Sequence, residues 1–215
     1  AQAASLRAAK AELSAKRLKE GGTSWENIPA SALKVGDIVL VEDPTYFVFL
    51  GILQSAVRQH GKIFVPTFAV GRAQLLLLLL SSFFRRGLVG PFPIYLDSPM
   101  AVEATRIYEQ HTDLFDEEMR AFLDEAPMAA DLKTLRLSLT AEDSKQINDV
   151  DGPCVVIAGA GMCNGGRILH HLKANLWKPD THVVVVGYQS HGTTGRQLVD
   201  GAKEIKLFGE PVAVR

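Results

Sequence analysis

From about residue 47 onward, short apolar runs alternate with longer amphipathic stretches and with loops that contain glycine. The runs VVIA (155–158) and VVVV (183–186) are apolar at every position. A strand with one face in water alternates apolar and polar residues, so a continuous run indicates that both faces are covered. Buried strands that alternate with helices predict a parallel α/β sheet with helices on both faces.

The bounds of the elements follow from the period of the apolar positions and from glycine and proline boundaries. The predicted helices cover residues 2–20, 50–60, 69–87, 101–111, 115–125, 141–149, 165–177 and 193–201. The predicted strands cover residues 38–41, 62–67, 93–97, 154–159, 182–187, 203–209 and 211–215. The predicted fold is therefore a Rossmann-like, mostly parallel α/β domain over residues 47–215, preceded by a helical N-terminal appendage over residues 1–46.

Composition is that of an ordinary globular chain, with 47% hydrophobic and 22% charged residues among 215. The formal net charge of −1 gives no general attraction for a polyanion, so nucleic-acid binding would need a local basic patch. The apolar run Leu75–Leu80 is far shorter than the about 20 residues that span a bilayer, so no membrane partner is expected. Cys154 and Cys163 form no CxxC pair, which favours a reduced, cytoplasmic setting.

Loops that follow strands are the candidate binding site, because ligands of doubly wound sheets gather where strands end. Arg72, Arg167 and Arg196 each lie near a helix start that follows such a loop. Free backbone N–H groups and guanidinium groups suit phosphate. If these loops share one edge of the sheet, the three arginines form a cationic rim for a polyanion. Taken alone, Arg72 is better explained as an ordinary surface arginine on a capped helix.

Further candidate RNA- or phosphate-binding residues lie in the same loops and are Ser98, Gly161, Gly165, Gly166, His191 and Thr193. The glycines would let a ligand approach the backbone closely. Ser98 is explained equally well as the cap of a helix that begins at Pro99. The glycine loop also suggests dinucleotide binding, but the G-x-G-x-x-G pattern requires glycine where Asn164 stands.

Metal and nucleophile motifs are absent from the sequence. The six histidines form no HxH, HxxxH or HExxH pattern, and no G-x-S-x-G elbow occurs. His170 and His171 point about 100° apart on a helix, so one of them is expected to be a buried packing residue. No catalytic residue, metal ligand or cofactor is therefore predicted in this chain.

Five motifs occur in the order and spacing of the β-CASP family, which comprises metallo-β-lactamase-fold nucleases that process RNA. They are IFVPTFAVGRAQ, PIYLDSPMA, AGAGMCNGGRILHHL, VVVVGYQSHGTTGRQLVDGA and IKLFGEPVAV, and the chain resembles the family over residues 47–215. The resemblance implies a cap domain inserted into a metallo-β-lactamase domain, with RNA running between the two toward zinc ions. The implied partners are RNA and that second domain; whether the chain forms a homodimer stays open.

The metal motifs of the family, HxHxDH before the cap and serine-alanine-histidine and histidine-glycine after it, are not found at those places in this sequence. The chain is therefore expected to bind RNA as the cap of a zinc-dependent ribonuclease and to be inactive alone. Glu42 is the candidate for the acidic residue of the family's E-S-T-Y-G motif, although its surroundings differ.

Residues 1–43 carry a second resemblance, to the catalytic subunit of potassium-importing P-type ATPases. SLRAAKAELSAKRL and IPASALKVGDIVLVE carry it, and they suggest that the chain is a chimera. Two alternatives to an RNA-binding cap stay open. One is a nucleotide-binding Rossmann-like enzyme, and the other is a non-functional fusion with an ATPase fragment.

Overall fold

A computed structural model describes residues 38–40 and 46–215 of the chain. These residues belong to one compact unit. The predicted helix over residues 2–20, most of the segment that resembles the P-type ATPase, and Glu42 lie outside the described residues and stay predictions. No helix of the described part is long and apolar enough to cross a membrane.

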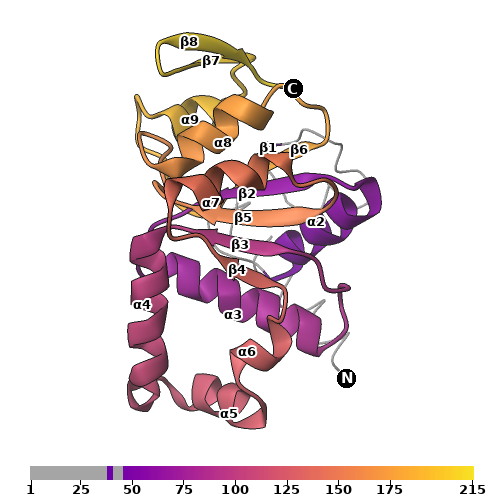
Figure 1. Cartoon of the computed structure of the whole chain (residues 1–215), viewed down its shortest axis with the longest axis vertical. Coiled ribbons are helices and arrows are strands. Elements are labelled where there is room, and N and C mark those ends of the chain that lie inside the picture. Colours follow the sequence, from indigo (N-terminus) through magenta and orange to yellow (C-terminus); the bar gives the residue numbers. More distant parts are fainter. Residues whose placement is uncertain (1–37, 41–45) are drawn as a thin grey trace, which may run out of the picture. The chain divides into compact units, whose positions relative to one another are not determined.

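The main sheet of the described part has six strands, and every neighbouring pair is parallel. Its order is β1-β6-β2-β5-β3-β4 (Figure 1), with β1 Ile38–Leu40, β2 Lys62–Pro66, β3 Ile94–Asp97, β4 Leu135–Leu137, β5 Cys154–Ala158 and β6 Thr181–Val185. A separate antiparallel pair follows, formed by β7 Glu204–Leu207 and β8 Glu210–Ala213. The predicted parallel α/β architecture is confirmed.

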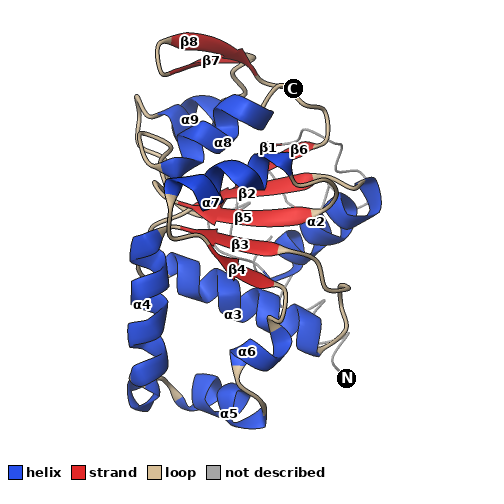
Figure 2. Cartoon of the chain, viewed as in Figure 1, coloured by secondary structure: helices blue, strands red, loops and turns tan. Residues whose placement is uncertain are grey.

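Helices lie on both sides of the sheet (Figure 2), as the continuous apolar runs require. They are α2 Tyr46–Gln59, α3 Arg72–Arg85, α4 Pro99–Gln110, α5 Glu117–Glu125, α6 Met128–Asp131, α7 Ala141–Gln146, α8 Arg167–Asn175 and α9 Thr194–Val199, with short 3-10 turns at Thr112–Leu114 and Ile147–Asp149.

The core lies on both faces of the central strands, and all five residues of β5 are buried. On one face, Phe64 of β2 and Val156 of β5 share a cluster with Leu172 of α8. Neighbours in a strand point to opposite faces, so Ile63 and Val155 face the other layer. Burial of each large side chain contributes about 1.5–3 kcal/mol relative to exposure, which fixes the central strands firmly.

One strand and one α-helix were not predicted from the sequence. Strand β4 has three residues at the edge of the sheet, and none of them is fully buried. Helix α6 is a single turn of four residues. Neither is long enough to produce a clear apolar period. Strand β1 falls before the predicted domain boundary at residue 46 and pairs with β6 of the same sheet.

Candidate nucleic-acid interface

The loops that leave β6, β2 and β5 meet at one edge of the sheet, because these strands are parallel neighbours. They lead to the starts of α9, α3 and α8, where Arg196, Arg72 and Arg167 lie. We call residues 67–71, 159–166 and 186–193 the loop edge. The arrangement that the sequence left conditional, three arginines at helix starts along one edge, is therefore present.

The β5 loop touches both of the other loops. A Cβ atom at Gly161 would lie 3.1 Å from the ring of Phe68, which joins the β5 loop to the β2 loop. The side-chain amide of Gln189 donates to the carbonyl oxygen of Gly161 at 2.9 Å. The backbone N–H of Thr194 donates to the side-chain oxygen of Asn164 at 3.2 Å. The loop edge is thus one continuous surface built from segments distant in sequence.

The glycines of the β5 loop have different roles. Gly166 has a φ of +74°, and a Cβ atom there would overlap the carbonyl oxygen of Gly159. That same oxygen accepts the backbone N–H of Ile168 at 2.9 Å, so the close approach closes the loop onto the start of α8. Gly161 is buried, whereas a Cβ atom at Gly165 would meet nothing within 4 Å. A side chain would therefore fit at the half-buried Gly165, whose carbonyl oxygen accepts the backbone N–H of Ala160 at 3.2 Å.

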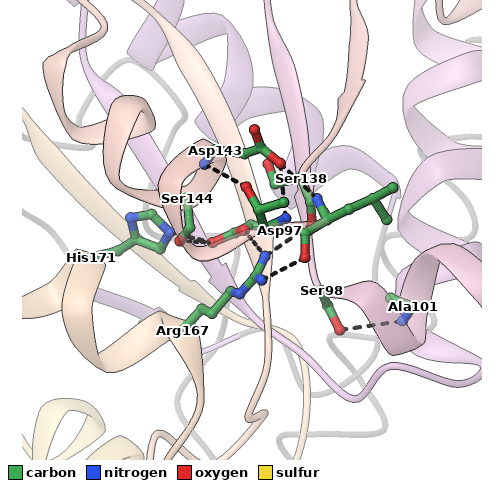
Figure 3. Close-up of polar contacts among 10 residues, drawn as sticks. Asp97, Ser98, Ala101, Ser138, Asp143, Ser144, Arg167 and His171 are labelled. Atoms are coloured by element: carbon green, nitrogen blue, oxygen red, sulfur yellow. Dashed lines mark hydrogen bonds and ion pairs between the residues drawn. The ribbon is translucent and has the colours of Figure 1, made fainter.

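A buried carboxylate lies next to this edge at the end of β3 (Figure 3). Asp97 is fully buried, and its oxygens lie 2.7 Å from Nη1 of Arg167 and 2.7 Å from Nε2 of His171. The hydroxyl of Ser144 donates to the same carboxylate at 2.6 Å. Burial alone would raise the pKa of Asp97, but the hydrogen bonds from His171, Ser144 and Arg167 outweigh it and hold the pKa below its ordinary value of 3.8.

Arg167 has protein partners for most of its guanidinium group. Besides Asp97, Nη1 donates to the carbonyl oxygen of Ser138 and Nη2 to that of Leu139, both at 2.9 Å. Only 22% of the side chain is exposed. These bonds attach the start of α8 to β3 and to the segment after β4. Arg167 therefore holds the loop edge in position through its hydrogen bonds to the protein. Its contact with phosphate stays a prediction.

His171 continues the buried network away from the edge. Its Nδ1 lies 3.1 Å from the side-chain oxygen of Asn148, which also accepts the amide of Asn175 at 3.0 Å. Both ring nitrogens thus lie within hydrogen-bond distance of side-chain oxygens, one of Asn148 and one of Asp97. His171 is buried and His170 is exposed, which confirms that one of the two adjacent histidines is a packing residue.

Two predicted ligands act as helix caps. The Ser98 hydroxyl accepts the backbone N–H of Ala101 at 3.2 Å and caps α4, so the capping alternative is confirmed. The Thr193 hydroxyl accepts the backbone N–H of Arg196 at 3.1 Å and donates to the carbonyl oxygen of Ser190 at 2.7 Å. Both hydroxyls are therefore engaged with backbone groups.

The remaining predicted residues differ in whether their side chains have hydrogen-bond or ion-pair partners. Nε of Arg196 lies 2.9 Å from the carboxylate of Asp200, one helical turn away at the surface. That hydrogen bond lowers the pKa of Asp200, and the nearby, exposed His191 adds to the effect. No described residue forms a hydrogen bond or ion pair with the guanidinium of the half-buried Arg72. Arg72 is thus the arginine of the loop edge whose charge is available to a ligand.

The described residues do not fit zinc. They contain no group of three or more His, Cys, Asp or Glu side chains that could hold a metal ion. Asp97 and His171 are adjacent, but the guanidinium of Arg167 lies 2.7 Å from the carboxylate and would repel a cation. Each carboxylate oxygen already accepts at least one hydrogen bond. We therefore assign no catalytic step to these residues.

Sequence reasoning missed the residues that hold the edge in place. None of Asp97, Ser144 and Gln189 was predicted as a site residue. An ionisable residue as the last position of the buried strand β3 was the available signal. Its partner His171 stands 74 residues further along the chain, so the contact left no local pattern.

Comparison with known proteins assigns this chain to a domain family. A family model described as "Beta-Casp domain" matches residues 73–198, which is more than half of the chain. The chain belongs to the Beta-Casp domain family. The expected β-CASP membership is thus confirmed, and the matched range contains Asp97, Arg167 and Arg196.

Relatives of this Beta-Casp domain include "Ribonuclease TTHA0252" of Thermus thermophilus, 40% identical over 78% of this chain and 38% of that protein. "Transcription termination factor FttA" of Methanosarcina mazei is 32% identical over 74% of this chain and 25% of that protein. The "RNase J-like protein" of Methanocaldococcus jannaschii is 31% identical over 76% of this chain and 37% of that protein. The chain therefore spans only part of each relative, between 25% and 38% of its length.

Proposed function

We propose that this Beta-Casp domain binds RNA at the loop edge, as the cap of a metallo-β-lactamase-fold, zinc-dependent ribonuclease of RNA processing or decay. The observation that carries the proposal is the loop edge, where the loops after β2, β5 and β6 meet and where the guanidinium of Arg72 has no partner among the described residues. Relatives named ribonuclease and RNase J-like protein support the same assignment. The metal-binding half and RNA are the proposed partners, in a cytoplasmic setting; a homodimer stays a prediction.

Phosphate is the part of RNA that this chemistry suits. A guanidinium donates two parallel hydrogen bonds to phosphate oxygens, and such charge-assisted bonds are stronger than neutral ones. The chain has a formal net charge of −1, so attraction must come from the loop edge and not from the whole molecule. Binding is therefore expected to be modest and to weaken as salt rises.

The test is the affinity of the full chain for a fluorescein-labelled single-stranded RNA, measured by fluorescence anisotropy at low salt. Arg72→Gln removes the free charge, and we expect a loss of about tenfold in affinity with a smaller salt dependence. Arg58→Gln is the matched control, since Arg58 is an exposed arginine near the end of α2, which leads into the opposite edge of the sheet. Equal affinity of the two variants would contradict the proposal.

Two further measurements distinguish an RNA-binding cap from a ribonuclease that is active alone and from a nucleotide-binding enzyme. Because the described residues do not fit zinc, the chain should not hydrolyse RNA with or without added zinc, and cleavage abolished by a chelator would overturn this expectation. Titration with NAD tests the nucleotide-binding alternative. Micromolar binding of NAD that RNA does not displace would favour that alternative over an RNA-binding cap.

A further inference from the structure

Strand β4 is the last strand at one side of the main sheet, and it pairs with β3 alone (Figure 1). The backbone N–H of Ser138 donates to the carbonyl oxygen of Leu96 at 3.1 Å, and the carbonyl oxygen of Thr134 accepts the N–H of Ile94 at 3.2 Å. The bonds to β3 thus come from every second residue, so the N–H and C=O groups of Leu137 point away from β3. No described residue forms a hydrogen bond with either group.

The same edge carries a row of leucines that the described residues leave uncovered. Residues 135–139 read LRLSL, an alternation that in an extended strand places three leucines on one face and arginine and serine on the other. Ser138 is only 3% exposed, whereas Leu137 and Leu139 are 47% and 48% exposed. A half-buried strand normally turns its polar residues to water. The exposed leucines therefore indicate a surface that another chain covers.

A second copy of this chain fits the edge, because the edge is complementary to itself. In an antiparallel pair, two opposite residues can exchange both of their N–H···O bonds. If Leu137 lies opposite the partner's Leu137, a two-fold axis passes between them, and the N–H of each donates to the carbonyl oxygen of the other. The same axis places Leu135 opposite the partner's Leu139, so that the two leucine rows face each other.

The charges near β4 permit this pairing. Arg136 would lie opposite the partner's Ser138, so no two like charges face each other across the strands. Its guanidinium is directed to β3, where Nη1 donates to the hydroxyl of Tyr95 at 3.2 Å. The leucine face of residues 135–139 carries no charged side chain, and the formal net charge of −1 gives little repulsion between two copies. The contact would therefore bury no unpaired charge.

We propose that the chain forms a two-fold dimer in which the β4 edges of two copies pair antiparallel and join their main sheets into one. The contact consists of the two backbone hydrogen bonds at Leu137 and the facing leucine rows. It does not depend on RNA binding at the loop edge. Because the pairing strand is short, the dimer is weak and forms reversibly as the concentration rises.

Sedimentation velocity of the full chain, over concentrations that reach the high micromolar range, measures the dissociation constant of the dimer. Leu137→Lys places two like charges face to face at the axis, and Leu137→Pro removes the N–H that donates across it. Each should raise the dissociation constant about tenfold or more. Leu137→Ile keeps an apolar side chain and the N–H, and should dimerise like the parent. Leu114→Lys is the matched control, since Leu114 is 78% exposed in the turn after α4.

Folding of the variants is checked by circular dichroism. Leu137→Pro should keep the spectrum of the parent, because the N–H that it removes does not bond to β3. If it unfolds the chain, Leu137→Lys and Leu139→Lys decide. A dimer weakened by the changes at Leu137 and not by Leu114→Lys supports the pairing of the edges. A parent chain that stays monomeric at every concentration overturns the proposal, as does a dimer that tolerates Leu137→Lys or is weakened equally by Leu114→Lys.

Discussion

Replacement of Asp97 by asparagine would remove the charge at the centre of the buried network while keeping its shape. The carboxylate is fully buried and accepts hydrogen bonds from Arg167, His171 and Ser144 at 2.6–2.7 Å. The neutral amide would leave the guanidinium of Arg167, 22% exposed, without its counter-charge. It would also turn an N–H group toward at least one of these donors.

The expected cost follows from these contacts. Removing one partner of a buried ion pair costs about 3–5 kcal/mol, because the remaining charge stays buried without compensation. The free energy of unfolding of a single domain is about 5–15 kcal/mol, so Asp97→Asn should remove a large part of the stability. We expect the free energy of unfolding to fall by about 3–5 kcal/mol.

Urea denaturation at pH 7, followed by far-ultraviolet circular dichroism, gives this free energy for the parent and the variant. Asp124→Asn is the control, because Asp124 is an exposed carboxylate in α5 and its replacement should change stability by less than about 0.5 kcal/mol. A loss for Asp97→Asn within about 1 kcal/mol would refute the view that Asp97 anchors Arg167.

The pH dependence gives a second test of the same carboxylate. The pKa of Asp97 is lowered in the folded chain from its ordinary value of 3.8, so its contribution is fully present above that value. The contribution is lost as the pH falls from 3.8 through the folded-state pKa. The difference between the parent and Asp97→Asn should therefore shrink in that acidic range, and a difference that grows there would contradict the assignment.

Two further predictions concern the glycine loop and the thiols. Gly166→Ala should lower the free energy of unfolding by about 2 kcal/mol or more, from positive φ and backbone overlap, whereas Gly165→Ala should stay within about 1 kcal/mol. Thermal unfolding compares the two, and equal melting temperatures would count against the loop geometry. Burial raises the pKa of Cys154 to about 11 and that of Cys163 to about 12. Both thiols should therefore react with Ellman's reagent at pH 8 only after denaturation, and rapid reaction of the folded chain would show exposed thiols.

The sequence by itself determined the fold class and most of the helices and strands. Burial and helical structure are both indicated by the spacing of apolar residues that are close in the sequence. Continuous apolar runs such as residues 154–158 indicated strands covered on both faces, and β5 is buried throughout. The cap at Ser98 before Pro99 is equally local. The three arginines could be assigned to one edge conditionally, since each follows a predicted strand. Short elements such as β4 were not predicted, because three residues are too few to show a pattern of alternating apolar and polar positions.

The tertiary structure alone decided which charges are available. Arg72 and Arg167 look alike in sequence, yet Arg167 is bound to Asp97, 70 residues away, while Arg72 has no partner among the described residues. The pair of Arg196 and Asp200 differs, because it joins residues four positions apart and is local in the sequence. Strand order separates these cases, because β5 lies between β2 and β3 although all three are distant in the chain. A pattern of residues reports burial and period, but the partner of a side chain depends on which strands become neighbours.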